Sequence, residues 1–159
     1  MTDATPDLAA RIADLEDRAA IADAIHAYCW HFDRNEPDAL ADLFADGARV
    51  DYGPDVPEIR GRAAIRAAVA RGLAEIFAAT SHHVSNIRIA REGPDAARST
   101  CLLYAWHRYR GGAPDGELWA QYHHRFVRID GAWKIAELRL AAAGTKDFHR
   151  ARMHPIGRA

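Results

Sequence analysis

Cysteine is scarce in this sequence, with only two residues, Cys29 and Cys101, in a chain of 159. Neither belongs to a Cys-x-x-Cys pair and both lie in apolar stretches. We therefore expect small buried hydrophobic side chains rather than metal ligands. Buried free thiols suit a reducing compartment, and the acidic N-terminal segment lacks the apolar core of a signal peptide. These features predict a cytoplasmic protein.

Long apolar runs and a strong net charge are also missing. No stretch approaches the ~18 apolar residues of a membrane span. The formal net charge of −1 creates no overall field that would attract nucleic acid or a membrane surface. Acidic residues outnumber basic ones in positions 1–80, and the reverse holds in 81–159. We interpret this as an acidic helical layer and a basic sheet layer of one domain, with no membrane or nucleic-acid partner.

The C-terminal segment 148–158 is basic and shows no clear periodicity. Its Arg150, Arg152 and Arg158 offer charges for phosphate contacts. A short basic tail is more often a solvated end or a cover over a pocket. We expect a lid or a surface for subunit packing rather than a nucleic-acid site.

The common signatures of covalent and cofactor chemistry are absent as well. There is no G-x-S-x-G nucleophile motif, no G-x-G-x-x-G and no G-x-x-x-x-G-K phosphate loop. Five histidines fall on predicted strands, but their spacing matches no zinc pattern. We therefore expect neither a cofactor nor a metal. The chemistry that remains needs a general base, a carboxylate that orients it, and phenols that stabilise developing negative charge.

Apolar periodicity predicts helices in the first half of the chain. Helical spacing extends from Leu8 to about Phe32, and the Asn35-Glu36-Pro37 stretch ends it. A short helix follows from Pro37, then a short strand at 48–52. A further helix is predicted from Arg62 to about Ala79.

After Ala79 the pattern changes to strict alternation, which predicts four long strands. They cover 81–91, 97–110, 117–129 and 132–142. The order predicts an α+β fold, with the helices packed on one face of a curved antiparallel sheet. We expect a single domain over residues 1–159, with tails at 1–7 and about 144–159.

Asp33 is an unusual residue at the C-terminal end of the first predicted helix. A carboxylate there opposes the helix dipole, which costs up to about 1 kcal/mol. Either a local ion pair with Arg34 or an imidazole partner inside a pocket would offset that cost. The sequence leaves both alternatives open.

The strand 81–91 begins with two histidines, and simple alternation separates them. One face holds His83 with Ile87 and Ile89, and the other holds His82 with Asn86. Parity therefore favours His83 as the inward residue. A β-bulge, which is common beside active sites, would reverse this assignment.

Four stretches together resemble the SnoaL-like domains of the nuclear transport factor 2-like superfamily. They are "LEDRAAIADAIHAYCWHFDRNEPDALADLFADGARVDY", "SHHVSNIRI", "YHHRFVRIDGAWKIAELRL" and "HRARMHPIGR". The resemblance covers about residues 8–158 and is much more specific for the fold than for a reaction. It implies a conical, cystatin-like α+β barrel, in which a strongly bent antiparallel sheet wraps around the N-terminal helices and leaves a deep apolar pocket.

In the branch of scytalone dehydratase, hexachlorocyclohexane dehydrochlorinase and bile-acid dehydratase, a His–Asp pair abstracts a proton without metal or cofactor. The resemblance maps this pair onto Asp33 and His82, against the parity argument. It also implies that Tyr28 and Tyr52 are pocket phenols and that His107 is a second catalytic histidine. Further substrate contacts are expected from a set of residues around the site: His83, Asn86, Trp30, Tyr122 and Arg125.

Three functions are compatible with this pattern. The first is a lyase or isomerase of the dehydratase type, acting on a small hydrophobic cyclic, polyketide-like or steroid-like substrate as a homodimer or homotrimer. The second is a non-catalytic ligand-binding module. The third is an interaction subunit resembling the β subunits of ring-hydroxylating dioxygenases. A hydrogen bond between Asp33 and His82 favours the enzyme, whereas side chains on opposite faces of the sheet favour the other two.

Overall fold

The computed structural model describes residues 7–157. Arg158 and the ends of both predicted tails lie outside the described residues. The helices are α1 (Leu8–Asp33), α2 (Pro37–Ala41) and α3 (Arg62–Glu75). The strands are β1 (Phe44–Asp51), β2 (Ile59–Arg60), β3 (Phe77–Arg91), β4 (Ala96–Tyr109), β5 (Gly116–Ile129), β6 (Ala132–Lys146) and β7 (His154–Pro155).

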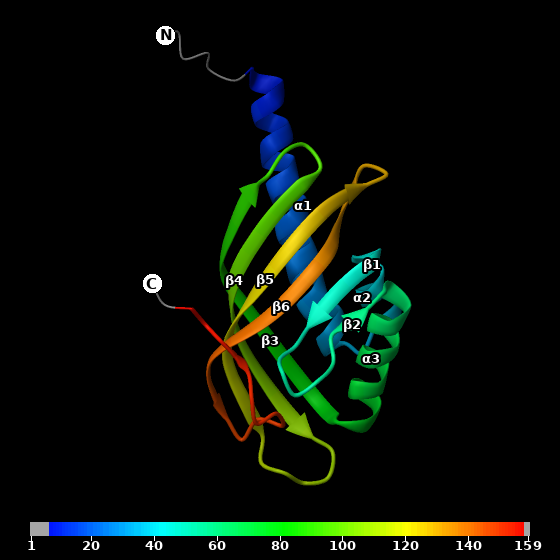
Figure 1. Cartoon of the computed structure of the whole chain (residues 1–159), viewed down its shortest axis with the longest axis vertical. Coiled ribbons are helices and arrows are strands. Elements are labelled where there is room, and N and C mark those ends of the chain that lie inside the picture. Colours follow the sequence, from blue (N-terminus) through cyan, green and yellow to red (C-terminus); the bar gives the residue numbers. More distant parts are fainter. Residues whose placement is uncertain (1–6, 158–159) are drawn as a thin grey trace.

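One strongly curved sheet holds all of these strands, in the order β2-β1-β6-β5-β4-β3 with β7 paired to β6. Figure 1 shows α1 lying against this sheet, while α2 and α3 stand beside β1 and β2. The predicted α+β class and the curved sheet against N-terminal helices are confirmed. The sheet is mixed, because β1 and β7 run parallel to β6, and it does not close into a barrel.

Several boundaries differ from the prediction, including the start of β1, which is Phe44 rather than residue 48. Two of the differences have a common origin. The third helix ends at Glu75 rather than Ala79, because the chain from Phe77 onward pairs with β4, beginning opposite Tyr109. Strand β6 continues to Lys146, so part of the predicted tail belongs to the sheet. Local periodicity did not reveal either, since both depend on partner strands distant in the sequence.

The core lies between α1 and the concave face of the sheet. On α1, the buried residues begin only at Ile21, while the earlier stripe residues Leu8 and Leu15 are exposed. Figure 1 shows the reason, since the N-terminal end of α1 projects beyond the sheet. Cys29 and Cys101 are both buried with free thiols, and burial raises the pKa of Cys101 to about 11.

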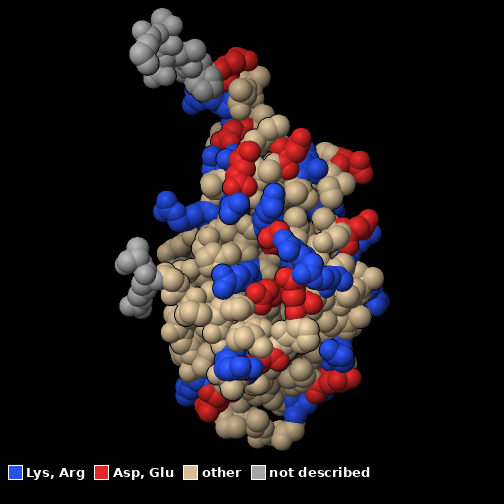
Figure 2. Space-filling view, in the orientation of Figure 1, with Lys and Arg blue, Asp and Glu red and all other residues tan. Residues whose placement is uncertain are grey.

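Ion pairs join the acidic helix α1 to the basic sheet. The acidic and basic charges are therefore in contact and do not form separate layers. The Asp17 carboxylate on α1 accepts hydrogen bonds from Arg128 Nη2 at 2.6 Å and Trp133 Nε1 at 3.0 Å, and it also contacts Arg91. On the face shown in Figure 2, acidic and basic side chains are correspondingly intermixed. Among residues 7–157, none of the helices combines the length and apolar character of a membrane span.

A β-bulge in β3 determines which histidine faces the core. Between Ser85 and Arg88 the strand has one residue more than its partner β4, and Asn86 adopts φ +53°. Asparagine tolerates this left-handed conformation better than most residues. Because of the extra residue, His82 and Val84 share the inward face with Ile87 and Ile89, which reverses the parity assignment.

We expect a β-branched residue to be poorly tolerated at the bulge. Asn86→Val should lower the free energy of unfolding by about 1–3 kcal/mol, because its branched side chain clashes with the backbone at positive φ. Asn86→Gly, which accepts this conformation freely, is the matched control and should change stability little. Urea denaturation measures both. Equal stability of the two variants would contradict this role for Asn86.

Candidate functional site

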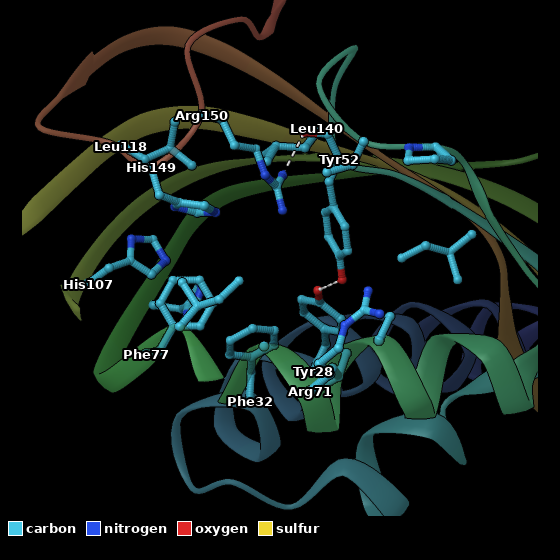
Figure 3. Close-up of a pocket in the computed structure, with 18 of the residues that line it drawn as sticks. Tyr28, Phe32, Tyr52, Arg71, Phe77, His107, Leu118, Leu140, His149 and Arg150 are labelled. Carbon is cyan, nitrogen blue, oxygen red and sulfur yellow. Dashed lines mark hydrogen bonds between the residues drawn. The ribbon is translucent and has the colours of Figure 1, made fainter. Parts of the chain in front are cut away.

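A cavity of about 610 Å³ opens between α1, α3, the concave face of the sheet and the segment after β6. This volume suits a small organic ligand. Its walls are mainly apolar and aromatic. Figure 3 shows most of the lining, including Phe32, Phe77, Leu118 and Leu140.

Asp33 and His82 meet at the edge of this cavity. The ring Nδ1 of His82 lies 2.6 Å from Asp33 Oδ1, and the backbone N–H of His82 donates to Asp33 Oδ2 at 2.7 Å. Thr80 Oγ1 donates to Oδ1 at 2.7 Å. The carboxylate at the end of α1 is therefore satisfied from β3, which offsets its unfavourable position at the helix C-terminus. Arg34 instead contacts Glu36.

The electrostatics of the pair keep Asp33 ionised. Burial alone would raise the pKa of this carboxyl group, but the hydrogen bonds and charge of His82, together with Thr80, outweigh burial and lower the pKa. An ionised carboxylate at Nδ1 places the proton of a neutral imidazole on that nitrogen. The other nitrogen, Nε2, is then an unprotonated acceptor. His82 lines the cavity, and only 5% of its side chain is exposed.

Two phenols form a second polar feature of the cavity wall. The hydroxyl groups of Tyr28, on α1, and Tyr52, just after β1, lie 2.6 Å apart (Figure 3). Burial raises the pKa of both groups, so both are neutral near pH 7. Since one hydroxyl donates to the other, one O–H of the pair remains available to a third oxygen, either the neighbouring Tyr122 hydroxyl or a ligand oxygen.

His107 lies beside the Asp33–His82 pair, and its imidazole is kept neutral by burial. Its ring centroid is 5.4 Å from that of His82, and its Nδ1 has no hydrogen-bond partner among residues 7–157. Burial, helped by the neighbouring histidines, lowers the pKa of His107 to about 3. At neutral pH it is therefore a polar imidazole rather than a cationic proton donor.

Comparison with known proteins decides the family. The SnoaL-like domain family matches residues 13–139, which is most of the chain. The chain belongs to the SnoaL-like domain family. Comparison with curated proteins gives no match.

Solved structures similar to this SnoaL-like domain include dehydratase-type proteins. A scytalone dehydratase candidate from Novosphingobium aromaticivorans DSM 12444 is 36% identical, with a TM-score of 0.87 over 94% of this chain and 99% of that chain. The type 2 hexachlorocyclohexane dehydrochlorinase LinA is 20% identical, with a TM-score of 0.81 over 93% and 99%. The LinA-type3 enzyme from Novosphingobium barchaimii LL02 is 19% identical, with a TM-score of 0.80 over the same shares. At these lower identities the likeness concerns the fold.

The structure brings together only some of the residues expected at the site of this SnoaL-like domain. Tyr28, Tyr52, His82, His107 and Tyr122 line the cavity, and Asp33 stands behind His82.

The remaining expected substrate contacts lie elsewhere on the domain. His83 and Asn86 are exposed because the bulge turns them outward, Trp30 is 62% exposed on α1, and Arg125 lies on the outer face of β5. None of these four lines the cavity.

Several lining residues of the SnoaL-like cavity were not predicted. Phe32 packs on His82 with ring centroids 4.9 Å apart, and Phe77 packs on His107 at 5.0 Å. Arg150 and His149 come from the C-terminal segment. Helical spacing already placed Phe32 on the inward stripe one residue before Asp33, so that signal was available. The position of Arg150 depends on the path of the tail, which has no periodicity.

Buried neutral histidines predict a loss of stability at mildly acidic pH. His124 is buried beside Ser99, whose hydroxyl lies 3.0 Å from Nδ1, and burial lowers its pKa from 6.5 to about 3. The unfolded chain therefore binds a proton below pH 6.5 that the folded chain does not, so stability falls as pH decreases from 6.5 towards 3.

His124→Gln removes this titrating group. We expect the variant to lose on the order of 1–2 kcal/mol less stability than the wild type between pH 7 and pH 5. Urea denaturation at both pH values measures the difference. Identical losses in the two proteins would mean that His124 is protonated in the folded state. His26→Gln, at an exposed position on α1, is the control.

Proposed function

We propose that this protein is a cofactor-independent lyase or isomerase of the dehydratase type, with His82 as general base and Asp33 as the residue that orients it. The substrate is a small, largely hydrophobic cyclic molecule that carries a carbonyl group. The apolar walls would exclude water from such a molecule, and the two polar features of the cavity match the two sites of charge change in the reaction.

The proton transfers in an elimination would run through one imidazole. Nε2 of His82 takes a proton from the carbon next to the carbonyl, and the electron pair of that C–H bond moves onto the carbonyl oxygen as an enolate. The Tyr28–Tyr52 pair donates a hydrogen bond to this oxygen. The enolate then reforms the carbonyl and expels a β-hydroxyl group, which takes the proton from the His82 imidazolium and leaves as water. Isomerisation differs only in that the proton returns to another carbon.

One observation carries the proposal, namely the 2.6 Å contact between His82 Nδ1 and Asp33 Oδ1 beside an apolar cavity. A pure binding module or an interaction subunit has no need for a carboxylate-oriented imidazole there. The outer face of the sheet does expose Trp119 and Leu102, at 43% and 41%. That exposure is compatible with contacts between subunits and does not explain the pair.

A direct test uses the purified protein and a panel of cyclic β-hydroxy ketones. Mass spectrometry should detect loss of water, or NMR a shifted double bond, without any added cofactor. Deuterium at the carbon next to the carbonyl should slow turnover, because that C–H bond breaks. Binding of the panel without any conversion would contradict the proposal and favour the ligand-binding module.

A further inference from the structure

Arg150 introduces a positive charge into the cavity from the C-terminal segment. Figure 3 shows its guanidinium group directed into the cavity beside Tyr52. Its Nη1 donates to the backbone oxygen of Tyr52 at 2.8 Å, and its Cζ lies 5.2 Å from the centroid of the Tyr52 ring. The group is thus held next to the phenol pair rather than in solvent.

Arg150 forms no salt bridge among residues 7–157, unlike its neighbours. Arg152, two positions later, pairs with Asp55 at 2.6 Å. Glu58, the acidic residue of the cavity lining, pairs with Arg60 at 2.6 Å. A partly buried cation without a counter-ion is unfavourable unless a ligand supplies one. Burial lowers the pKa of Arg150, an effect that the nearby tyrosines and the more distant Asp55 only partly offset.

A second guanidinium adds to the positive character of the cavity. Arg71 on α3 belongs to the lining and has no ion pair among the described residues. It is largely exposed, whereas Arg150 is half-buried. Arg71 therefore suits a role at the entrance, and Arg150 suits direct contact with a bound molecule. With Glu58 already neutralised, the charged groups of the lining favour an anion.

We propose that Arg150 is a specificity-determining residue that binds a carboxylate on the substrate, so that this SnoaL-like domain acts on small aromatic or alicyclic acids. A planar guanidinium can bind a carboxylate through two parallel hydrogen bonds. Because Nη1 already donates to the Tyr52 backbone oxygen, Nε and Nη2 remain for these two bonds. The statement that the ligand is a substrate rests on the proposed function. The statement that it is an anion rests on Arg150 alone.

The segment that carries Arg150 is held in place by contacts of the residues that follow it, Arg152 to Pro155. The backbone N–H of Arg152 donates to Asp55 Oδ2 at 2.7 Å, and His154 Nε2 lies 2.8 Å from Asp51 Oδ2. Strand β7 then pairs with β6. These contacts hold the guanidinium in place before a ligand arrives, which reduces the entropy lost on binding.

The test compares two ligands of the same shape, 2-naphthoate and its neutral analogue 2-naphthamide. Calorimetry should show that the wild-type protein binds the carboxylate about 10- to 100-fold more tightly, the range of a charge-assisted hydrogen bond. Arg150→Gln should abolish this preference, and Arg150→Lys should retain part of it because the charge remains without the planar fork. Arg98→Gln, with the same charge change on the outer face of the sheet, is the control and should keep the full preference.

Equal affinity of the wild type for the two ligands, failure of both to bind, or a full preference in Arg150→Gln would each overturn the proposal. Circular dichroism confirms that the variants fold, and the wild-type comparison stands even if Arg150→Gln does not. The same measurement on His82→Gln separates this proposal from the general-base proposal. That variant should keep the carboxylate preference while losing turnover.

Discussion

Asp33→Asn is expected to lower turnover about 10²- to 10⁴-fold while the protein stays folded. In the proposed mechanism, the carboxylate would accept a hydrogen bond from Nδ1–H of His82, 2.6 Å from Asp33 Oδ1, and would stabilise the imidazolium that forms when Nε2 takes a proton. An amide has no charge for the second task and its N–H₂ group can favour the wrong tautomer. Steady-state kinetics on a substrate identified from the panel measures the effect.

His82→Gln should give a similar loss, and the double variant should be no worse than the stronger single variant, because the two residues act as one unit. His83→Gln is the matched control, since the adjacent imidazole is exposed and lies outside the cavity. Wild-type turnover in a folded Asp33→Asn or His82→Gln protein would exclude the pair as the base.

Tyr28→Phe is expected to lower turnover about 10²- to 10³-fold, the effect of losing one donor to a developing oxyanion. The Tyr28 and Tyr52 hydroxyls lie 2.6 Å apart, so removal of either breaks the pair and misplaces the remaining O–H. The loss should appear in kcat more than in KM, because the hydrogen bond strengthens as the oxygen gains charge. Kinetics of Tyr28→Phe and Tyr52→Phe checks this.

Tyr104→Phe is the control for this change. The change removes the same atom from Tyr104. Its hydroxyl donates to Glu117 at a distance of 2.8 Å, and Tyr104 does not line the cavity. Its turnover should stay at the wild-type level. If Tyr28→Phe matched Tyr104→Phe in activity, the phenol pair would have a structural role only.

The fold class was predictable because the decisive signals are local. Apolar spacing identified α1 almost to the residue, since the predicted end at Phe32 compares with the observed end at Asp33. The β5–β6 hairpin turns at Asp130-Gly131, a dipeptide typical of tight hairpin turns. The parallel position of β1 and the short strand β7 were not predicted, because a strand that pairs across a long sequence distance has no local signature of its direction.

The contact between Asp33 and His82 was predictable from the family pattern, but not from the alternation of residues along β3. Parity along β3 favoured His83, and the structure places His82 against Asp33. The difference arises from one extra residue at Asn86, whose backbone conformation cannot be deduced from the alternation itself.

Arg150 was missed as a site residue for a related reason. Its role depends on a segment that crosses the cavity and is fixed by Asp51 and Asp55, far away in the sequence. Its sequence neighbours show only a basic tail. Charge composition alone therefore indicated a lid without indicating which arginine turns inward.

The protonation state of the His82 ring tests the central claim most directly. Nitrogen-15 NMR of the ring in the free protein at pH 7 and above distinguishes the two tautomers of the neutral imidazole. The geometry predicts that the proton of the neutral ring resides on Nδ1, so that Nε2 is unprotonated, and that Asp33→Asn weakens this preference. A proton on Nε2 of the neutral ring, unchanged by Asp33→Asn, would contradict the account.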